Sequence, residues 1–510
     1  MSSELRWPRL PVMQIMACEP KPGTALGHLA NRFFLSLAMA GMGATARRRL
    51  VQATRNVGGT QARVLRTILR ENAFTDFGRA HGFSKISDWA SYRAAVPVGD
   101  FQAFAPMIER QMAGHSNSLT ASKPLYYART SSSTGAAKDI PITHHGRAQV
   151  NEAQKQLALT LYRKTGFFDG RIMGIGGPPV EGTTSTGASF GSTTGHQYAS
   201  SSSVIRSKLV IPVEVFSIAD YDIKYLVLAI FGLLEADLTG IATANPSTIL
   251  RLIELIGEER TAIQSVLAKQ RAALERIPSD LQTEIMRRID AVPDRIAHIP
   301  RHLDTGDQIT VSDIWPRLSA IAVWTGASCG LAVERLRQLM APETKVVEIG
   351  YRCSEFVGTI NIDADTNVCV PNLHNIVFEF VERTQREADI FEFRTLEQLR
   401  VGYEYYPFIT TQDGLYRYDV NDIVRMTGRF NDCPTLEFVQ KGAGVTNITG
   451  EKISEQQVLT AVGHAFASLS LPTPFFVLLA DEGRARYELI FEHSEQTAPC
   501  PAQLAGFSWE

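Results

Sequence analysis

Near residue 130 a run of short hydroxyl side chains lies beside a lone lysine, and this run limits what the segment can be. Residues 128–138 read ARTSSSTGAAK. Small residues let backbone N–H groups approach phosphate oxygens, hydroxyls donate further hydrogen bonds, and Lys138 adds a mobile positive charge. The stretch does not fit the GxxxxGK[ST] pattern of a Walker A loop. The residues alone leave two interpretations open, a phosphate-binding loop and a flexible Ser-rich linker.

Composition narrows the class of protein. The chain has 510 residues, 44% hydrophobic and 20% charged, with a formal net charge of -2. This length allows two or more domains, and the charge balance gives no basic excess for nucleic acid. No cysteine pair has CxxC spacing, so reduced thiols in a cytoplasm are the simplest interpretation. The cysteines are Cys18, Cys329, Cys353, Cys369, Cys433 and Cys500.

The apolar stretch at residues 29–44 predicts an amphipathic first helix. It is too short to span a bilayer, and its positive charges, at residues 47–49, follow the apolar run instead of preceding it. We therefore expect neither a secretory signal nor a membrane anchor here.

The first half of the chain is expected to be rich in helices. Residues 60–115 show helical periodicity, and 247–257 reads as a helix with Ser247 as N-cap and Gly257 as its end. The chain up to about residue 299 is charged and predicts a surface helical layer. Residues 174–203 are so rich in Gly and Ser that they predict a long loop.

Short β-rich runs dominate the second half. They lie at residues 318–326, 345–355 and 375–382, and a hairpin around Asp413-Gly414 continues into a second one. Helices followed by mixed strands predict an α/β fold of layered sheets and helices.

Several motifs in order resemble one known family. The loop TSSSTGAAK resembles the TSGTTGxPK loop of the adenylate-forming superfamily. The stretches around it are similar to the auxin-responsive Gretchen Hagen family of acyl-acid amido synthetases, from about residue 60 to the C-terminus. They are ILRENAFTDFGRAHGFSKI, VPVGDFQAFAPMIERQMAG, KDIPIT, GLYRYDVNDIVRMTGRF and NITGEKISEQQV.

The resemblance implies an ATP site at the hydroxyl run. The phosphate-binding positions are then Thr130, Ser131, Ser132, Ser133, Thr134 and Gly135, and Lys138 is a catalytic cation. Ser132 stands where the superfamily usually has Gly, which would allow positive φ and a close backbone approach. A serine there puts the strength of ATP binding in doubt.

Three later motifs complete the implied nucleotide site. In YRCSE, similar to the superfamily's YGxTE, Tyr351 would stack on adenine, Ser354 would contact the α-phosphate and Glu355 would hold Mg²⁺. In YDVND, Asp422 would bind the ribose hydroxyls, and Asn421 replaces a Gly but tolerates the left-handed conformation. The turn Thr325-Gly326 would line the adenine and acyl site, or is an ordinary strand-to-helix turn.

The resemblance also divides the chain into domains. Residues 1–59 would be an N-terminal extension with the first helices, 60–440 a large adenylate-forming domain, and 441–510 a small α+β lid. Lys441 would lie at the hinge and contact the nucleotide, and Lys452 would reach phosphate in one lid orientation. The lid reads as shorter than is usual in the family, which puts the second half-reaction in doubt.

The implied activity has two steps. A carboxylic acid attacks ATP to give acyl-AMP and pyrophosphate, with Mg²⁺ present, and an amine such as an amino acid then takes the acyl group. A coenzyme A ligase of the same superfamily and a non-catalytic nucleotide-binding relative stay open as alternatives. The expected partners are these small substrates, without nucleic acid or membrane.

Overall fold

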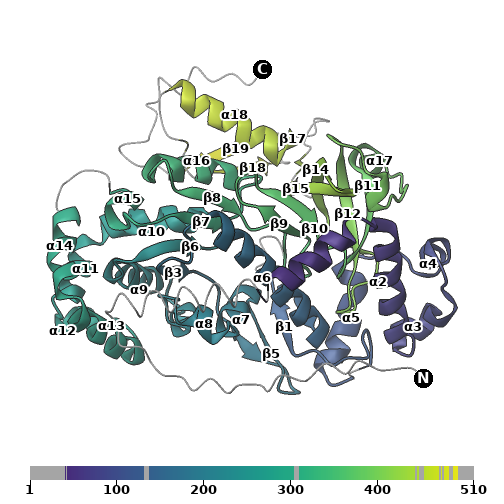
Figure 1. Cartoon of the computed structure of the whole chain (residues 1–510), viewed down its shortest axis with the longest axis horizontal. Helices are drawn as coiled ribbons and strands as arrows, with labels where there is room; N and C mark the ends of the chain where they lie inside the picture. The colour runs from purple at the N-terminus through teal and green to yellow at the C-terminus, as the bar shows by residue number, and fades with distance from the viewer. Residues whose placement is uncertain are drawn as a thin grey trace, which may run out of the picture.

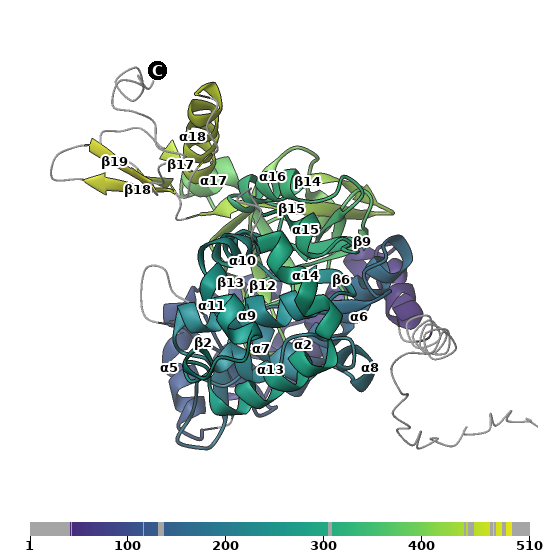
Figure 2. The same cartoon turned by 90° about the vertical axis from the view of Figure 1, so that its left-hand side faces the viewer.

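The computed structural model shows a layered α/β molecule with a small C-terminal part set to one side (Figures 1 and 2). It describes residues 41, 43–115, 117–130, 137–303, 309–442, 445–446, 453–469, 473, 476–481 and 486–491. The predicted fold class is confirmed: helices alternate with three main sheets.

The N-terminal region is helical, as predicted for residues 60–115. Short helices begin at side-chain caps: Asn56 caps α2, Thr75 caps α3, Asp88 caps α4 and Asp100 caps α5. The helices are α2 (Val57–Glu71), α3 (Asp76–Ala80), α4 (Trp89–Ala95) and α5 (Phe101–Met112). Leu65, Ile68 and Leu69 of α2 are buried in the same apolar cluster as Val377 and Phe378, so this region packs on the antiparallel sheet.

A four-stranded parallel sheet forms the second layer. Its order is β3-β6-β7-β8, from strands Arg171–Gly174, Leu238–Ala242, Ala320–Val323 and Lys345–Glu348. Helices α9 (Tyr221–Leu234), α10 (Ser247–Glu258), α11 (Arg260–Leu267), α13 (Ser279–Ala291) and α16 (Cys329–Leu339) lie beside it in Figure 1. Parallel sheets are buried by such crossover helices.

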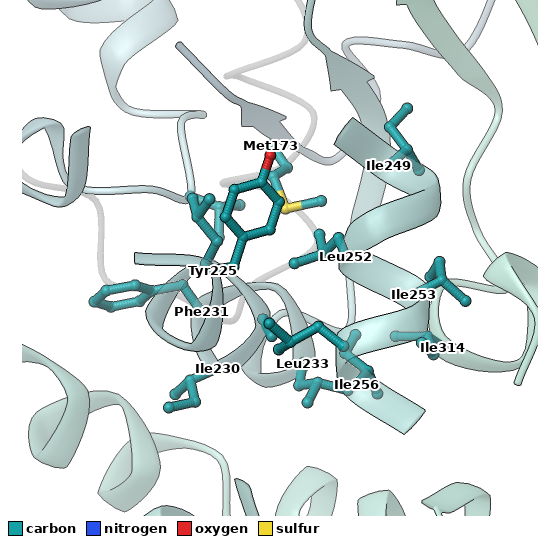
Figure 3. Packing of buried hydrophobic residues seen from close by; sticks show 14 of the residues in the cluster. Met173, Tyr225, Ile230, Phe231, Leu233, Ile249, Leu252, Ile253, Ile256 and Ile314 are labelled. Atoms are coloured by element: carbon teal, nitrogen blue, oxygen red, sulfur yellow. The ribbon is translucent and has the colours of Figure 1, made fainter. Parts of the chain in front are cut away.

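The helices after residue 247 are more deeply buried than the predicted surface layer. α10 buries Ile249, Leu252, Ile253 and Ile256 against α9 in one large cluster (Figure 3). The charged residues that suggested a surface layer occupy only the outer faces of these amphipathic helices.

The predicted ends of α10 were wrong by a residue or two. Ser247 is the first helical residue, after Pro246, and its side chain makes no capping hydrogen bond. Instead the Asn245 side chain accepts from the Ser247 N–H at 2.9 Å. The helix continues through Gly257 to Glu258 and leads into α11, so this glycine does not end it.

Residues 174–203 are not the long loop that their composition suggested. They contain β4 (Gly182–Thr183), β5 (Ser189–Gly191) and α7 (Thr193–Ala199). The serines serve as caps here, since Ser192 caps α7. A Cβ on Gly195 would lie 2.3 Å from the Gly177 carbonyl oxygen, so this glycine permits close chain packing.

β5 joins this segment to the hydroxyl run. It pairs in parallel with β1 (Tyr126–Arg129), which is antiparallel to β2 (Asp139–Ile142), in a sheet of order β2-β1-β5-β4. After β2, the long helix α6 (His144–Lys164) begins at the Thr143 cap.

An antiparallel sheet contains the predicted hairpins. β11 (Val377–Glu382), β12 (Glu404–Thr410), β14 (Asp422–Phe430) and β15 (Cys433–Lys441) are neighbours in that order, and β13 (Tyr418–Asp419) pairs with β12. Gly414 turns the first hairpin at φ +95°. β9 (Thr359–Asp363) and β10 (Val368–Pro371) form a separate pair.

The C-terminal part has its own small core. Helix α18 (Glu455–Ser468) packs Val458, Val462 and Phe466 against the hairpin of β18 (Phe476–Asp481) and β19 (Arg486–Phe491). A short pair, β16 (Val445–Thr446) with β17 (Ile453–Ser454), precedes it. In the part of the chain that is described, no helix is long and apolar enough to cross a membrane.

A buried ion pair fastens the first hairpin to the N-terminal helices. Arg417 Nε lies 2.9 Å from Glu379 Oε2 on β11, and both side chains are almost fully buried, 4% and 2% exposed. Arg93 of α4 donates to the other oxygen of Glu379 at 2.7 Å, and Arg417 also donates to the Val96 carbonyl at 2.9 Å. The Glu379 carboxylate on β11 therefore connects helix α4 and the hairpin at Arg417, which are distant in sequence.

A second buried carboxylate ties the same hairpin to α6. The backbone N–H and hydroxyl of Thr143 donate to Asp413 Oδ1 at 2.8 and 2.7 Å. A Cβ on Gly146 would lie 1.8 Å from Asp413 Oδ2, so only glycine allows this approach. Burial raises the pKa of Asp413 to about 6, although the Thr143 hydrogen bonds oppose the rise.

We predict that Glu379→Gln strongly destabilises the protein. The neutral amide would leave Arg417 as a buried charge without a counter-charge, which costs about 3–5 kcal/mol. Urea unfolding measures the loss. The matched control is Glu437→Gln, which removes a half-exposed partner of Arg425 and should cost about 1 kcal/mol or less. Equal losses in the two variants would show that burial of the pair does not matter.

We also predict a pH-dependent stability that Asp413→Asn removes. Because the folded-state pKa of Asp413 lies above its unfolded value, the protonated form stabilises the fold below about pH 4. That contribution is lost as pH rises through 6. Unfolding free energies at pH 4 and pH 6 should show the variant gaining on the wild type by about 2 kcal/mol. A constant difference across this range would contradict the raised pKa.

Candidate active site

A large cavity lies where the parallel sheet, the antiparallel sheet and the sheet holding the hydroxyl run meet. Its volume is about 1980 Å³. Its wall includes residues from every predicted nucleotide motif that is described: Thr130, Lys138, Thr325, Gly326, Tyr351, Ser354, Glu355, Asp422 and Lys441. Positions more than 300 residues apart in sequence therefore line one space.

The base of the hydroxyl run is closed by the backbone. The Thr130 N–H donates to the Lys138 carbonyl at 3.0 Å, and the Lys138 N–H donates to the Thr130 hydroxyl at 3.3 Å. Next to it, Arg129 donates to both oxygens of Asp139 at 2.9 and 2.7 Å. The two ends of the run are thus held side by side at the cavity wall. The predicted phosphate-binding residues Ser131, Ser132, Ser133, Thr134 and Gly135 lie outside the described residues.

Lys138 is half-buried and makes no ion pair within the described chain. Its ammonium group lies 5.6 Å from the centre of the Phe101 ring on α5. A cation held only over a ring keeps its hydrogen-bond donors free for an anionic ligand. The other predicted catalytic lysine, Lys452, lies outside the described residues.

Tyr351, Asp422 and Lys441 form one contact network. The Tyr351 hydroxyl donates to Asp422 Oδ2 at 2.7 Å, and Lys441 Nζ lies 2.6 Å from Asp422 Oδ1. Asp422 is 1% exposed, and burial raises its pKa, while Lys441 and Tyr351 act against the rise. Burial acts to lower the pKa of Lys441, but the attraction of Asp422 leaves it above normal.

Backbone geometry sets this network in place. Asp422 begins β14 and Lys441 ends β15, and the two residues are paired across the strands. Asn421, just before Asp422, has φ +54°, a left-handed conformation that Asn tolerates better than most residues. The Gly442 N–H then donates to the Asn421 carbonyl at 2.8 Å.

Glu355 and Ser354 follow Tyr351 at the cavity wall. Glu355 is buried, 8% exposed, and accepts a hydrogen bond from the Tyr418 hydroxyl at 3.2 Å. Burial and the nearby carboxylates of Glu355 and Asp422 raise the pKa of Cys353 well above normal, so its thiol stays protonated. Within the described chain no group of three or more His, Cys, Asp or Glu side chains could hold a metal ion.

The Thr325-Gly326 turn is fixed by a carboxylate and by close packing. The Thr325 N–H and hydroxyl both donate to Glu348 Oε2 at 2.7 Å, and the Gly350 N–H donates to Oε1 at 2.8 Å. A Cβ on Gly326 would lie 2.8 Å from the Phe438 carbonyl oxygen. The turn thus joins the parallel sheet to β15.

Phe438 is a cavity residue that the motifs did not indicate. Its ring stacks on Tyr351 with centroids 5.7 Å apart and planes at 12°. One face of Tyr351 is therefore covered within the protein, and Phe356 packs against the same ring with centroids 5.4 Å apart, so the ring has little room for the predicted stacking on adenine. The aromatic residue in an alternating strand, PTLEFVQK, carried no sequence signal for this contact.

Two models of one protein family match successive parts of the chain. The model of the GH3 family N-terminal domain matches residues 46–345, and that of the GH3 family central domain matches residues 369–441. Indole-3-acetic acid-amido synthetase GH3.15 of Arabidopsis thaliana is 25% identical in an alignment 441 residues long that covers 82% of this chain and 73% of that protein. GH3.8 of Oryza sativa is 24% identical in an alignment 440 residues long that covers 82% and 72% of the two chains.

Solved structures agree on the fold. The AtGH3.15 acyl acid amido synthetase in complex with 2,4-DB superposes with a TM-score of 0.76 at 20% identity, covering 90% of this chain and 83% of that one. At this identity the likeness speaks for the fold alone, whereas the two family models together span most of the chain. The chain belongs to the GH3 family.

Proposed function

We propose that this protein is an ATP-dependent acyl-acid amido synthetase. The single observation that carries the proposal is the cavity that brings Lys138, the Ser354-Glu355 pair and the Asp422-Lys441 pair around one space. The family membership and relatives named as amido synthetases support it. The reaction joins a small carboxylic acid to an amine such as an amino acid.

In the first step, a carboxylate oxygen of the acid attacks the α-phosphorus of ATP and pyrophosphate leaves. Both reactants are anionic, so the site must neutralise charge and fix their positions. Lys138, with its donors free, supplies positive charge beside the phosphates, and Thr130 and Ser354 supply hydroxyl donors. We assign the hydroxyl residues 131–134, Gly135 and Lys452, which lie outside the described residues, to the phosphates as well, on the motif alone.

In the second step, the nitrogen of the amine attacks the acyl carbonyl, AMP leaves and the nitrogen loses a proton. The buried walls of the cavity would shield the acyl-adenylate from water. We propose that residue 441 separates the large domain from the lid, with residues 1–59 preceding the large domain. A cytoplasmic location is consistent with the scattered cysteines.

Mg²⁺ fits the site through Glu355. That carboxylate lines the cavity, and its described partners are the neutral Tyr418 hydroxyl and Cys353 thiol. Mg²⁺ usually takes one or two protein carboxylates with substrate phosphates and waters, so one carboxylate suffices. When bound, it would neutralise the charge that develops on the phosphates.

Asp422 is the proposed ribose-binding group, but its carboxylate is engaged. Lys441 and Tyr351 occupy both of its oxygens. Ribose hydroxyls would have to take the place of the Lys441 contact. We propose that Lys441 moves toward the phosphates when nucleotide binds, and that Thr325 and Gly326 then line the adenine.

ATP–pyrophosphate exchange with a panel of carboxylic acids tests the proposed function. Exchange that depends on an acid indicates acyl-adenylate formation. Product analysis with amino acids and with coenzyme A then distinguishes amide from thioester formation. If no acid supports exchange, the alternative of a non-catalytic nucleotide-binding protein is favoured.

We predict that Lys138→Ala lowers the exchange rate by about 100-fold or more, since loss of one positioned charge at a transition state commonly has that effect. Steady-state kinetics with varied ATP measure it. Lys138→Arg should restore part of the rate. An unchanged rate and KM for ATP in the alanine variant would remove Lys138 from the site.

Glu355→Gln should keep the fold and lose Mg²⁺-dependent turnover, because a neutral amide is a poor ligand for a hard cation. The Gln side chain can still accept from Tyr418, so thermal stability should change little. Exchange rates are measured across a Mg²⁺ titration. Superimposable titration curves for variant and wild type would exclude Glu355 as a metal ligand.

A further inference from the structure

The segment Tyr351–Cys353 places its side chains on two different sides. Tyr351 contacts Asp422, and Cys353 lies close enough to Asp422 and Lys441 to feel their charges. Arg352 instead lies near Glu348 and Cys369, and its Nη2 donates to the Ile349 carbonyl. Arg352 therefore lies on a different side of the segment from the proposed ribose contact, near the Glu348 carboxylate that holds the Thr325-Gly326 turn.

The guanidinium of Arg352 lines the cavity without a counter-charge. Among the described residues no carboxylate lies within ion-pair distance, and its buried Nε has no hydrogen-bond partner. Glu348, the carboxylate whose charge acts on Arg352, already accepts hydrogen bonds from Thr325 and Gly350. Burial lowers the pKa of Arg352, although Glu348 opposes this. A charged group that is buried and unpaired is costly unless a ligand completes it.

The other described cations at the cavity wall have partners or roles. Arg129 is bound to Asp139 through two hydrogen bonds, and Lys441 is paired with Asp422. The Lys138 ammonium group has no ion pair within the described chain but is assigned to the phosphates in the proposed reaction, and Lys155 is exposed. Arg352 is the partly buried cation among them that has neither a described counter-charge nor a role in that reaction.

An apolar surface adjoins Arg352. Ile349, whose carbonyl binds the guanidinium, belongs to a cluster whose members also line the cavity. These members are Leu161, Phe167, Phe168, Ile172 and Ala322. An apolar wall with one fixed guanidinium suits a ligand with a hydrophobic body and a carboxylate, because Arg binds carboxylates through two parallel hydrogen bonds.

We propose that Arg352 binds a carboxylate of the acyl substrate and thereby sets which acids the enzyme accepts. The inference rests on the proposed function. The carboxylate has two sources, the reacting group itself or a second acid group on the same molecule. Arg352 is a specificity-determining residue in either case, and the amine and nucleotide do not contact it.

The experiment compares wild type with Arg352→Met and Arg352→Lys. Calorimetry measures binding of aromatic and straight-chain monocarboxylic acids, each beside its dicarboxylic counterpart, and exchange kinetics measure KM for acid and for ATP. Arg352→Met should weaken acid binding roughly 10- to 100-fold, with KM for ATP unchanged. The lysine variant should recover part of the affinity. Arg271→Met, at a 92% exposed arginine, is the control.

Two results support the proposal and distinguish the two possible sources of the carboxylate. An equal loss for both members of each pair assigns Arg352 to the reacting carboxylate, and a loss confined to diacids assigns it to a second one. Unchanged binding of every acid overturns the proposal. So does a raised KM for ATP, or normal exchange with a defect only in amide formation. Melting temperatures show whether Arg352→Met is still folded. If it is not, acid binding by Arg352→Lys decides the question.

Calorimetry keeps this test separate from the proposed function. If wild type binds acids but catalyses no exchange, the proposed function fails, and a loss of binding in Arg352→Met still supports the carboxylate role. If wild type binds no acid, both proposals fail.

Discussion

The site depends on one buried ion pair, between Arg417 and Glu379. Glu379 also binds Arg93, so helix α4, strand β11 and the hairpin before β13 are fixed together. Arg417 has φ +47°, an unusual conformation for this residue type that these contacts hold in place. The next residue, Tyr418, places its hydroxyl on Glu355, and four residues further Asp422 meets Tyr351. The geometry of both site carboxylates follows from this anchor.

Local patterns predicted the elements better than their ends. The strands at 320–323, 345–348 and 377–382 and the hairpin at Asp413-Gly414 were predicted, because alternation and turn chemistry act over a few residues. Residues 174–203 were mistaken for a loop because composition alone does not show how a serine is used. Ser192 caps a helix, and Phe190 receives the Arg129 guanidinium 3.7 Å from its ring centre.

In the candidate site, too, some residues were predictable from the sequence and others were not. Family motifs indicated Lys138, Glu355 and Asp422, and the left-handed conformation of Asn421 is one that its residue type tolerates. The Phe438 ring on Tyr351 and the shared carboxylate of Glu379 were not predictable, since each joins strands that only the folded sheets bring together. Arg352 lies within a motif that was identified from the sequence. The absence of a described partner for its Nε depends on the surrounding fold and was therefore not predictable.

The close contact of Gly326 with the Phe438 carbonyl has a consequence for how this cavity can diverge among relatives. The two main sheets meet there through main-chain atoms, and no side chain is present whose size could be tuned. A mutation that widened the cavity by moving the two sheets apart would first have to break this contact between Gly326 and the Phe438 carbonyl. New substrate preferences are therefore expected from side chains that line the space, such as those of α6, α7, the end of β8 and Phe438.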